Sequence, residues 1–262
     1  MNKKIWRLVL TGENDAFFNM AVDEVLMESV RQGTSLPTLR FYGWQPPAIS
    51  LGYHQKIKEV VDLEKCRKAG IEVVRRPTGG RAVYHEKELT YSIVATTDSA
   101  LFSKSILKSY LVIAGAFVEG LKHLGVKAEI QRRPVETRHG VSLLCFSTPS
   151  FYEVMVAGKK ILGSAQRRIN GVLLQQGSLL LAGEQKNSIP FLGSNLSLTE
   201  IEEKTATVER LLQRKVSFDE VKDALVEGFS EKLSVEFVVQ DLTKLEKERV
   251  DFLKWRIKNE NI

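Results

Sequence analysis

The sequence has few of the residues that usually hold a disulfide scaffold or a metal ion. Its 262 residues include two cysteines, Cys66 and Cys145, and four histidines that are scattered along the chain. Neither cysteine lies at the spacing of a disulfide framework or of a zinc site. We therefore expect no disulfide framework and no metal site.

Long apolar runs are missing as well. No stretch approaches the roughly 20 apolar residues that a membrane helix needs. Residues 1–18 carry charge, but they lack an apolar segment followed by a small-residue cleavage site, so they do not resemble a signal peptide. These absences predict a cytoplasmic protein without a membrane partner.

The excess of basic residues is modest, with a net charge of +6. The chain has no dense block of Lys and Arg with interleaved aromatic residues and no recognisable nucleic-acid module, so we expect no nucleic-acid partner. An acidic protein or a phosphate-bearing substrate fits the charge at least as well. Solubility alone would also account for a charge of this size.

The first half of the chain mixes helical and strand patterns. Asn19 can cap a helix whose apolar residues follow helical spacing and which Gly33 ends. A longer helix is predicted over 103–125, with Gly125 at its end. Short segments rich in β-branched and aromatic residues, separated by Gly and Pro, predict strands. These segments are 38–44, 48–54, 71–76, 88–95 and 127–131.

The second half begins with a polar loop at 132–142, followed by a strand cluster at 150–181 with hairpin turns at 157–160 and 167–171. Further on, helix-start boxes alternate with a strand at 234–239. This order predicts an α+β fold, a mainly antiparallel mixed sheet flanked by helices, and argues against a doubly wound βαβα plan. We expect one domain over 1–262 with a helical C-terminal segment at about 197–262. The three boxes are Thr199 with Glu202, Ser217 with Glu220, and Thr243 with Glu246.

The stretch "RRPTGGRAVYH" at 75–85 is the first candidate for chemistry. Its two glycines would let backbone N–H groups approach a carboxylate, a phosphate or an oxyanion. It matches neither the P-loop nor the Rossmann spacing. A plain hairpin turn is the simpler interpretation of a Gly-Gly pair, but Arg76, Arg81 and His85 beside the turn favour a binding site.

Three other positions have both a structural and a functional interpretation. Cys145 follows two leucines, as a small core residue does, yet it precedes the turn-like "STPS". Lys159 and Lys160 follow a hairpin glycine, and strand alternation allows only one of them to face a given site. Arg7 lies in the first predicted strand, where pairing with a surface carboxylate is favoured over contact with substrate.

Taken together, the motifs resemble one family. "RRPTGGRAVYH", "GKKILGSAQRR" and "QQGSLLL", in that order, are similar to motifs of the lipoate–protein ligase, octanoyltransferase and biotin ligase family, and "FNMAVDEVL" and "RFYGWQPPAISLGYHQ" add to the match. The resemblance covers roughly residues 6–229. It implies an α/β catalytic domain built on a mainly antiparallel sheet, which agrees with the strand pattern.

Within this family the resemblance is greatest to the octanoyltransferases of Gram-positive bacteria. Family ligases carry a third glycine where this chain has Arg81, and a histidine where it has Gln176. Many ligases also have a small accessory domain, for which little chain remains. The octanoyltransferases have a cysteine in the loop before the "GKK" hairpin, and Cys145 occupies that position. An ATP-dependent lipoate ligase, a lipoyl-domain amidotransferase and a non-catalytic lipoyl-protein binder are the alternatives.

The resemblance implies a reaction and its partners. An octanoyl group would pass from octanoyl-acyl carrier protein through a thioester on Cys145 to a lysine of a lipoyl-domain protein, such as the glycine cleavage H protein or a 2-oxoacid dehydrogenase E2 subunit. ATP and Mg²⁺ would be needed only by the ligase alternative. Lys160 would lower the pKa of the thiol and could accept a proton from the amine. We also expect Arg132, Arg133 and Arg138 to help dock the acidic carrier.

The same resemblance, with the turn chemistry above, assigns a substrate-binding set. The Gly-Gly amides would hold the thioester carbonyl, and the acyl tail would lie between this turn and the strand at 161–165. His85 would shape that slot, and Arg76 would order the turn. The expected set is Arg76, Thr78, Gly79, Gly80, Arg81, His85, Gly163, Ser164, Ala165, Gln176 and Gly177.

Overall fold

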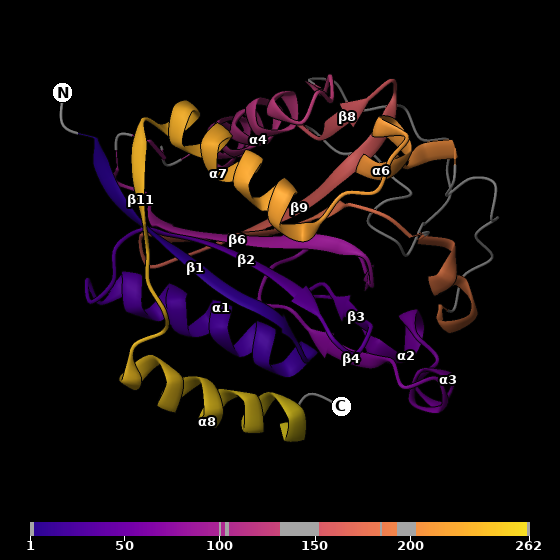
Figure 1. Cartoon of the computed structure of the whole chain (residues 1–262). Coiled ribbons are helices and arrows are strands. Elements are labelled where there is room, and N and C mark those ends of the chain that lie inside the picture. The colour runs from indigo at the N-terminus through magenta and orange to yellow at the C-terminus, as the bar shows by residue number, and fades with distance from the viewer. Residues whose placement is uncertain are drawn as a thin grey trace.

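The structure is a computed structural model in which a mixed sheet lies between two layers of helices (Figure 1). Helices α4 (Ile106–His123) and α7 (Phe218–Leu233) cover one face, while α1 (Ala16–Arg31) and α8 (Lys244–Glu260) cover the other. The predicted α+β class is therefore confirmed. The structure describes residues 3–99, 101–102, 105–131, 152–183, 185–192 and 203–260.

The main sheet has the strand order β11-β1-β2-β6-β10-β9-β8-β7 in the described residues. The pairs β11–β1 and β1–β2 are parallel, and each of the other neighbouring pairs is antiparallel, which confirms the predicted mainly antiparallel sheet. Its strands are β1 (Lys4–Asn14), β2 (Thr38–Trp44), β6 (Glu88–Thr96), β7 (Glu129–Ile130), β8 (Val154–Val156), β9 (Lys159–Ile169), β10 (Val172–Leu180) and β11 (Val235–Val239).

Two tight hairpins join β8, β9 and β10, and both were predicted. Ala157 and Gly158, with φ of 48° and 75°, link β8 to β9, and Asn170 and Gly171, with φ of 47° and 79°, link β9 to β10. Positive φ at both central residues is the geometry of the turn that suits the twist of an antiparallel hairpin. The short turns fix the registers on which the site depends.

A second, smaller sheet has the order β4-β3-β5. Strand β4 (Glu72–Arg75) is parallel to β3 (Ala48–Leu51), and β5 (Val83–His85) is antiparallel to it. The Gly-Gly turn therefore connects two strands that lie on opposite sides of β3, and the hairpin interpretation is wrong. Short helices accompany these sheets, namely α2 (Ile57–Val60), α3 (Leu63–Lys68), α6 (Val208–Leu212) and the 3-10 helix η2 (Gln185–Phe191).

Helix α1 begins four residues earlier than the sequence predicted. Asp15 is its N-cap and accepts a hydrogen bond from Phe18 N at 2.8 Å, so the predicted cap at Asn19 is wrong. Asn19 is fully buried, and its side-chain amide donates to Gly43 O at 2.9 Å. Both residue types can cap a helix, and here the tertiary contact of Asn19 decides between them.

Helices α4 and α7 cross at two glycines. A Cβ atom at Gly228 would lie 2.2 Å from Gly120 N and 2.5 Å from Gly120 Cα. The helix backbones therefore touch, which brings Phe117 and Phe229 together with ring centroids 5.0 Å apart. This contact seats both helices on the sheet. None of the helices in the described part of the chain has the length and apolar character needed to span a bilayer.

We predict that Gly228→Ala lowers the free energy of unfolding by about 1–3 kcal/mol, because the new methyl group must push two packed backbones apart. Glu227→Ala, on the exposed side of the same helix, should stay within about 0.5 kcal/mol of the parent. Urea unfolding of both variants measures the difference. Equal stability of the two variants would contradict the close crossing.

The segment predicted to be helical at about 197–262 contains α6, α7, strand β11 and α8 in its described part. Ser217 caps α7 by accepting from Glu220 N at 3.0 Å, as predicted. Thr243 and Glu246 form a reciprocal box, with Glu246 N donating to Thr243 Oγ1 and Thr243 N donating to Glu246 Oε2. The first box, Thr199 with Glu202, lies outside the described residues.

The partner of Arg7 differs from the expectation. Arg7 is buried and donates to both carboxylate oxygens of Glu246, each at 2.8 Å, so its partner is a buried carboxylate and not a surface one. Burial would raise the pKa of Glu246, but the hydrogen bonds from Arg7 and from the Thr243 backbone outweigh burial and leave this pKa below its usual value. The pair ties α8 to β1.

We predict that Glu246→Gln lowers the free energy of unfolding by about 3–5 kcal/mol, because the Arg7 guanidinium is then buried without a counter-charge. In the parent protein the same contribution should be complete above the usual carboxyl pKa and should disappear as the pH falls through the lowered one. Denaturant unfolding at several pH values measures both effects. Exposed Glu248→Gln is the control, and a loss of the same size there would contradict the role of the pair.

Candidate active site

A pocket opens where β9 and β10 meet the small sheet and α1. Seven residues of the predicted substrate-binding set line it: Arg76, His85, Gly163, Ser164, Ala165, Gln176 and Gly177. The structure thus places a cavity beside the predicted strand. The other lining residues are Met20, Tyr42, Trp44, Ser50, Val83, Thr90 and Ser178, which the sequence did not single out.

The Gly-Gly turn stands beside the pocket and does not contribute to its described lining. Arg76 holds the turn through hydrogen bonds from Nη2 to Gly79 O and Arg81 O, both at 2.7 Å. Gly80 has a φ of +88°, and a Cβ at Gly52 would lie 1.9 Å from Gly80 O, so the turn packs directly on the end of β3. A Cβ at Gly79 would meet nothing within 4 Å. That side of the turn is open to an approaching group.

Below the turn lies a fully buried ion pair between Asp23 of α1 and Arg40 of β2, with Oδ1 and Nη1 2.7 Å apart. Asp23 also accepts hydrogen bonds from Ser92, Tyr42 and Gln176 at 2.6, 3.0 and 2.6 Å. Burial, and then the negative charge of Asp23, raises the pKa of Tyr42 well above its usual value, so its hydroxyl stays a donor. One carboxylate therefore joins α1 to three strands of the sheet.

Gln176 connects this carboxylate to the Gly-Gly turn. Its amide nitrogen donates to Asp23, and its amide oxygen accepts from the Thr78 hydroxyl at 2.8 Å. Thr78 is fully buried, which explains why it holds the turn without lining the pocket. Sequence reasoning selected Thr78 and Gln176 but missed Asp23 and Arg40. The "FNMAVDEVL" stretch, in which a lone Asp lies among helical apolar positions, was the available signal.

We predict that Asp23→Asn lowers the free energy of unfolding by about 3–5 kcal/mol, because Arg40 loses the counter-charge of a fully buried pair. Exposed Asp219→Asn, whose carboxylate pairs with Lys222 on the surface, is the matched control and should change it by less than about 1 kcal/mol. Urea unfolding gives both values. If the two variants were equally stable, Asp23 would not be the anchor described above.

A second buried cluster forms the inner wall of the pocket. His85 Nδ1 lies 2.5 Å from Glu88 Oε1, and His85 Nε2 lies 2.7 Å from Ser50 Oγ. The imidazole stacks on Trp44 with ring centroids 3.9 Å apart. His85 is therefore fixed in position and orientation, as expected of a residue that shapes the slot.

Glu88 connects several residues of this wall through hydrogen bonds to its carboxylate. The same carboxylate oxygen accepts hydrogen bonds from Thr90 at 2.6 Å and from Ser178 at 2.8 Å, and Trp44 Nε1 donates to Thr90 at 2.7 Å. Glu88 was missed by the sequence analysis, which treated it as the first residue of a strand. Its spacing of three residues from His85 across a strand boundary gave no periodic signal.

Of the two hairpin lysines, Lys159 is exposed and Lys160 is buried. Lys160 Nζ donates to Glu153 Oε1 at 2.5 Å. Among the described residues, Lys160 does not line the pocket, although Gly163, Ser164 and Ala165 farther along the same strand do. Glu153, just before β8, was also missed. The register of the β8–β9 hairpin brings Glu153 near Lys160, and this register can be derived only after the turn between the strands has been located.

Cys145, the predicted nucleophile, lies outside the described residues, as do Arg132, Arg133 and Arg138. The other cysteine, Cys66, is buried in a hydrophobic cluster below the small sheet. Burial, and then the charge of Asp62, raises the pKa of the Cys66 thiol to about 11. Cys66 therefore stays a thiol near neutral pH and is a poor nucleophile.

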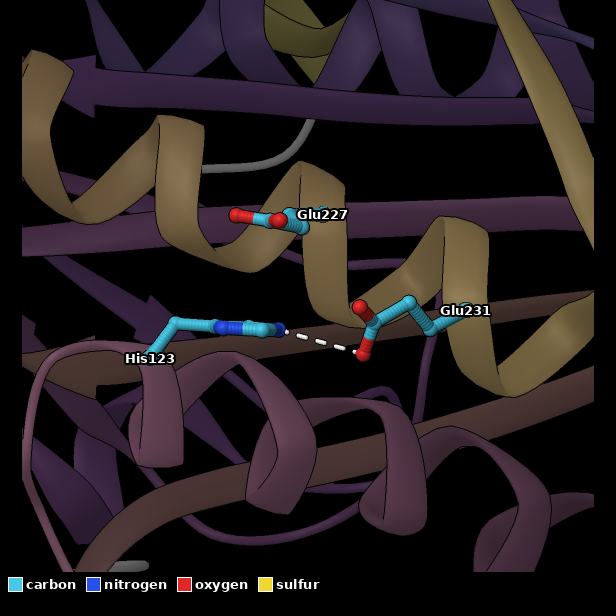
Figure 2. A group of neighbouring side chains, drawn as sticks. All are labelled: His123, Glu227 and Glu231. Carbon is cyan, nitrogen blue, oxygen red and sulfur yellow. Dashed lines mark hydrogen bonds and ion pairs between the residues drawn. The ribbon is translucent and has the colours of Figure 1, made fainter.

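Away from the pocket, His123 of α4 and two residues of α7, Glu227 and Glu231, form an exposed group (Figure 2). His123 Nε2 lies 3.1 Å from Glu231 Oε2. This contact connects the two helices, and all three residues are exposed. We interpret the group as a surface contact between helices.

The sequence profile of the lipoyl protein ligase A/B catalytic domain matches residues 15–230. The chain belongs to this family. The family assignment agrees with the motifs at the pocket, since the Gly-Gly turn, β9 and β10 all lie within the matched range. It confirms the family that the motifs predicted.

Two curated relatives match almost the full chain. Octanoyltransferase LipM of Geobacillus kaustophilus is 38% identical, over 97% of this chain and 95% of its own length. Octanoyltransferase LipM of Kyrpidia tusciae is 42% identical, over 95% and 94%. These relatives confirm the predicted enzyme class, an acyltransferase.

Solved structures of the family have the same fold. The bipartite lipoate protein ligase of Thermoplasma acidophilum superposes with a TM-score of 0.82 at 28% identity, covering 98% of this chain and 95% of its own. A lipoate-protein ligase A bound with ATP gives a TM-score of 0.79 at 30% identity, covering 95% and 94%. Transferases and ligases of the family thus share one architecture, and the fold alone does not separate them.

Proposed function

We propose that the protein transfers an octanoyl group from octanoyl-acyl carrier protein to a lysine of lipoyl-domain proteins, in protein lipoylation. The observation that carries the proposal is the similarity to octanoyltransferases along nearly the whole chain. A lipoyl-domain acceptor is supported by the archaeal relative, which was described as a lipoate protein ligase together with its E2 lipoyl domain.

The pocket is suited to an alkyl tail held among polar neighbours. Met20, Trp44 and Val83 offer apolar surface, and the strand residues Gly163 and Gly177 line the pocket beside them. The polar groups in the wall, such as His85 and Ser50, already have hydrogen-bond partners within the protein. An acyl chain can therefore enter without leaving these groups unsatisfied.

The acyl group must be activated before an amine can attack it, and we propose a thioester as the activated form. The Cys145 thiol loses its proton, and the thiolate attacks the donor carbonyl and forms a new C–S bond. The C–S bond to the carrier breaks, and the departing carrier thiolate takes up the proton that Cys145 lost. The acceptor lysine then attacks as a free amine, the C–S bond breaks, and the amide forms. The proton lost from the amine returns to the Cys145 sulfur.

An ATP-dependent lipoate ligase is the second candidate, because a structural relative is a ligase bound with ATP. The turn of this chain carries Arg81 where family ligases have a third glycine, and Arg76 already occupies the Gly79 and Arg81 carbonyls. We therefore favour a thioester donor and no ATP or Mg²⁺. A magnesium-ATP requirement would decide for the ligase.

We predict that mixing the protein with octanoyl-acyl carrier protein, without ATP, adds one octanoyl mass to the chain, and that Cys145→Ser removes both the adduct and transfer to a lipoyl domain. Cys66→Ala is the matched control and should keep both, because the Cys66 thiol is protonated near neutral pH. Intact-protein and peptide mass spectrometry locate the adduct. Full transfer by Cys145→Ser, or transfer that needs ATP, would overturn the proposal.

A further inference from the structure

The pocket extends along the main sheet, and its lining includes residues from two successive rows across the strands. Residues that pair across neighbouring strands lie in one row, and residues two apart along a strand point to the same face. Two residues of a strand span about 7 Å, so neighbouring rows lie about that far apart. The first row contains Arg40, Ser92, Gln176 and Ala165. The second row contains Tyr42, Thr90, Ser178 and Gly163.

The Gly-Gly turn and Trp44 mark the two ends of this series. Gln176 of the first row accepts a hydrogen bond from Thr78 of the turn at 2.8 Å, and a Cβ at Gly80 would lie 3.6 Å from the Cβ of Ala165. The turn therefore lies over the first row. Trp44 ends β2, two residues beyond the second row, and so belongs to a third row. Trp44 thus lines the pocket at the end remote from the turn.

The indole of Trp44 is buried and fixed by its neighbours. Its Nε1 donates to Thr90 Oγ1 at 2.7 Å, and its ring stacks on the His85 imidazole with centroids 3.9 Å apart and planes 12° apart. His85 is itself held by Glu88 and Ser50. The indole turns aside only with the loss of a hydrogen bond and a stacked partner, so this end of the pocket has a rigid wall.

The smaller apolar side chains of the lining are less suited to close that end. Met20 lies near the first row, with its Sδ 3.6 Å from Gln176 Nε2, and its unbranched side chain adapts readily to its neighbours. Val83 packs on Leu180, which follows the second row, but its side chain is short and has no polar anchor. Trp44 combines size, a hydrogen bond and a stacked ring, so it provides the firmest part of the end wall.

We propose that Trp44 is a specificity-determining residue that limits the length of the acyl chain by closing the pocket at the end remote from the Gly-Gly turn. The inference rests on the proposed function and deepens it, because it restricts the substrates to saturated acyl groups no longer than octanoyl. With the carbonyl at the open side of Gly79, the methyl end of the chain points toward Trp44. A longer chain must displace the indole from Thr90 and His85.

A smaller side chain in place of Trp44 leaves apolar space at this end of the pocket. Each further methylene group that the space accepts favours binding, because it is removed from water. The proposal therefore predicts a change in the preference among chain lengths, which a merely structural role of Trp44 would not produce.

The experiment measures transfer to a lipoyl domain from acyl carrier protein loaded with octanoyl or decanoyl groups. The readout is the ratio of kcat/KM for decanoyl to that for octanoyl, because a general loss of active protein lowers both values equally. We expect Trp44→Leu to raise this ratio at least about tenfold, and Trp44→Phe to raise it less. An unchanged ratio in folded Trp44→Leu would overturn the inference.

Trp6→Leu is the matched control. Trp6 is also buried, but it lies on β1, packs on Phe102 and Phe237, and does not line the pocket in the described part of the chain. This variant should lose stability and keep the parent ratio. If it shifted the ratio as much as Trp44→Leu does, the length limit would not reside at Trp44.

A second measurement needs no transfer. Calorimetric titration with hexanoate, octanoate and decanoate should show that affinity for the parent rises up to octanoate and then stops rising, while Trp44→Leu gains about a further tenfold with decanoate. The same limit in both proteins would contradict the role of Trp44. If the parent transfers no octanoyl group, the proposed function fails, and this series still tests the length limit.

Two further outcomes are decided in advance. If the parent neither transfers the acyl groups nor binds the acids, the pocket is not an acyl site and the inference is overturned. If Trp44→Leu does not fold, Trp44→Phe, which keeps an aromatic ring, supplies both measurements.

Discussion

The buried ion pair between Asp23 and Arg40 is the interaction on which the rest of the structure depends. Both side chains are fully excluded from water, so each charge is tolerated only while the other is present. Through Gln176 and Thr78 the same carboxylate reaches the turn beside the pocket. The position of that turn is therefore set by the core as well as by the hydrogen bonds of Arg76 within the turn, and both explain how a glycine-rich segment keeps one conformation.

Local signals in the sequence were sufficient wherever the deciding contacts are local. The turns at Gly158 and Gly171 and the cap at Ser217 are set by backbone preferences within a few residues, and each was predicted at its observed place. The start of helix α1 was not predicted at its observed residue, because a distant contact decides it. Asp15 and Asn19 have similar capping ability, but the Asn19 side chain is bound instead by the Gly43 carbonyl and by Arg40, 24 and 21 residues away.

The candidate site shows the same division. The pocket-lining strands were found from motifs, because a glycine or a polar residue in an apolar strand stands out. The acids that organise the site, Asp23, Glu88 and Glu153, were missed, because each acts through a partner on another strand or helix. Strand β9 contacts two of these places: Gly163 and Ala165 border the pocket, while Lys160 at the start of the strand contacts Glu153.

The parallel pairing of β1 with both β11 and β2 has a consequence for synthesis on the ribosome. Strand β1 is made first, but its outer neighbour β11 is made more than 200 residues later. Until then one edge of β1 has no strand partner, and the Arg7 guanidinium lacks the Glu246 carboxylate with which it pairs in the folded protein. The nascent chain therefore carries an open sheet edge until β11 has been made, and this edge could pair with another chain in the meantime.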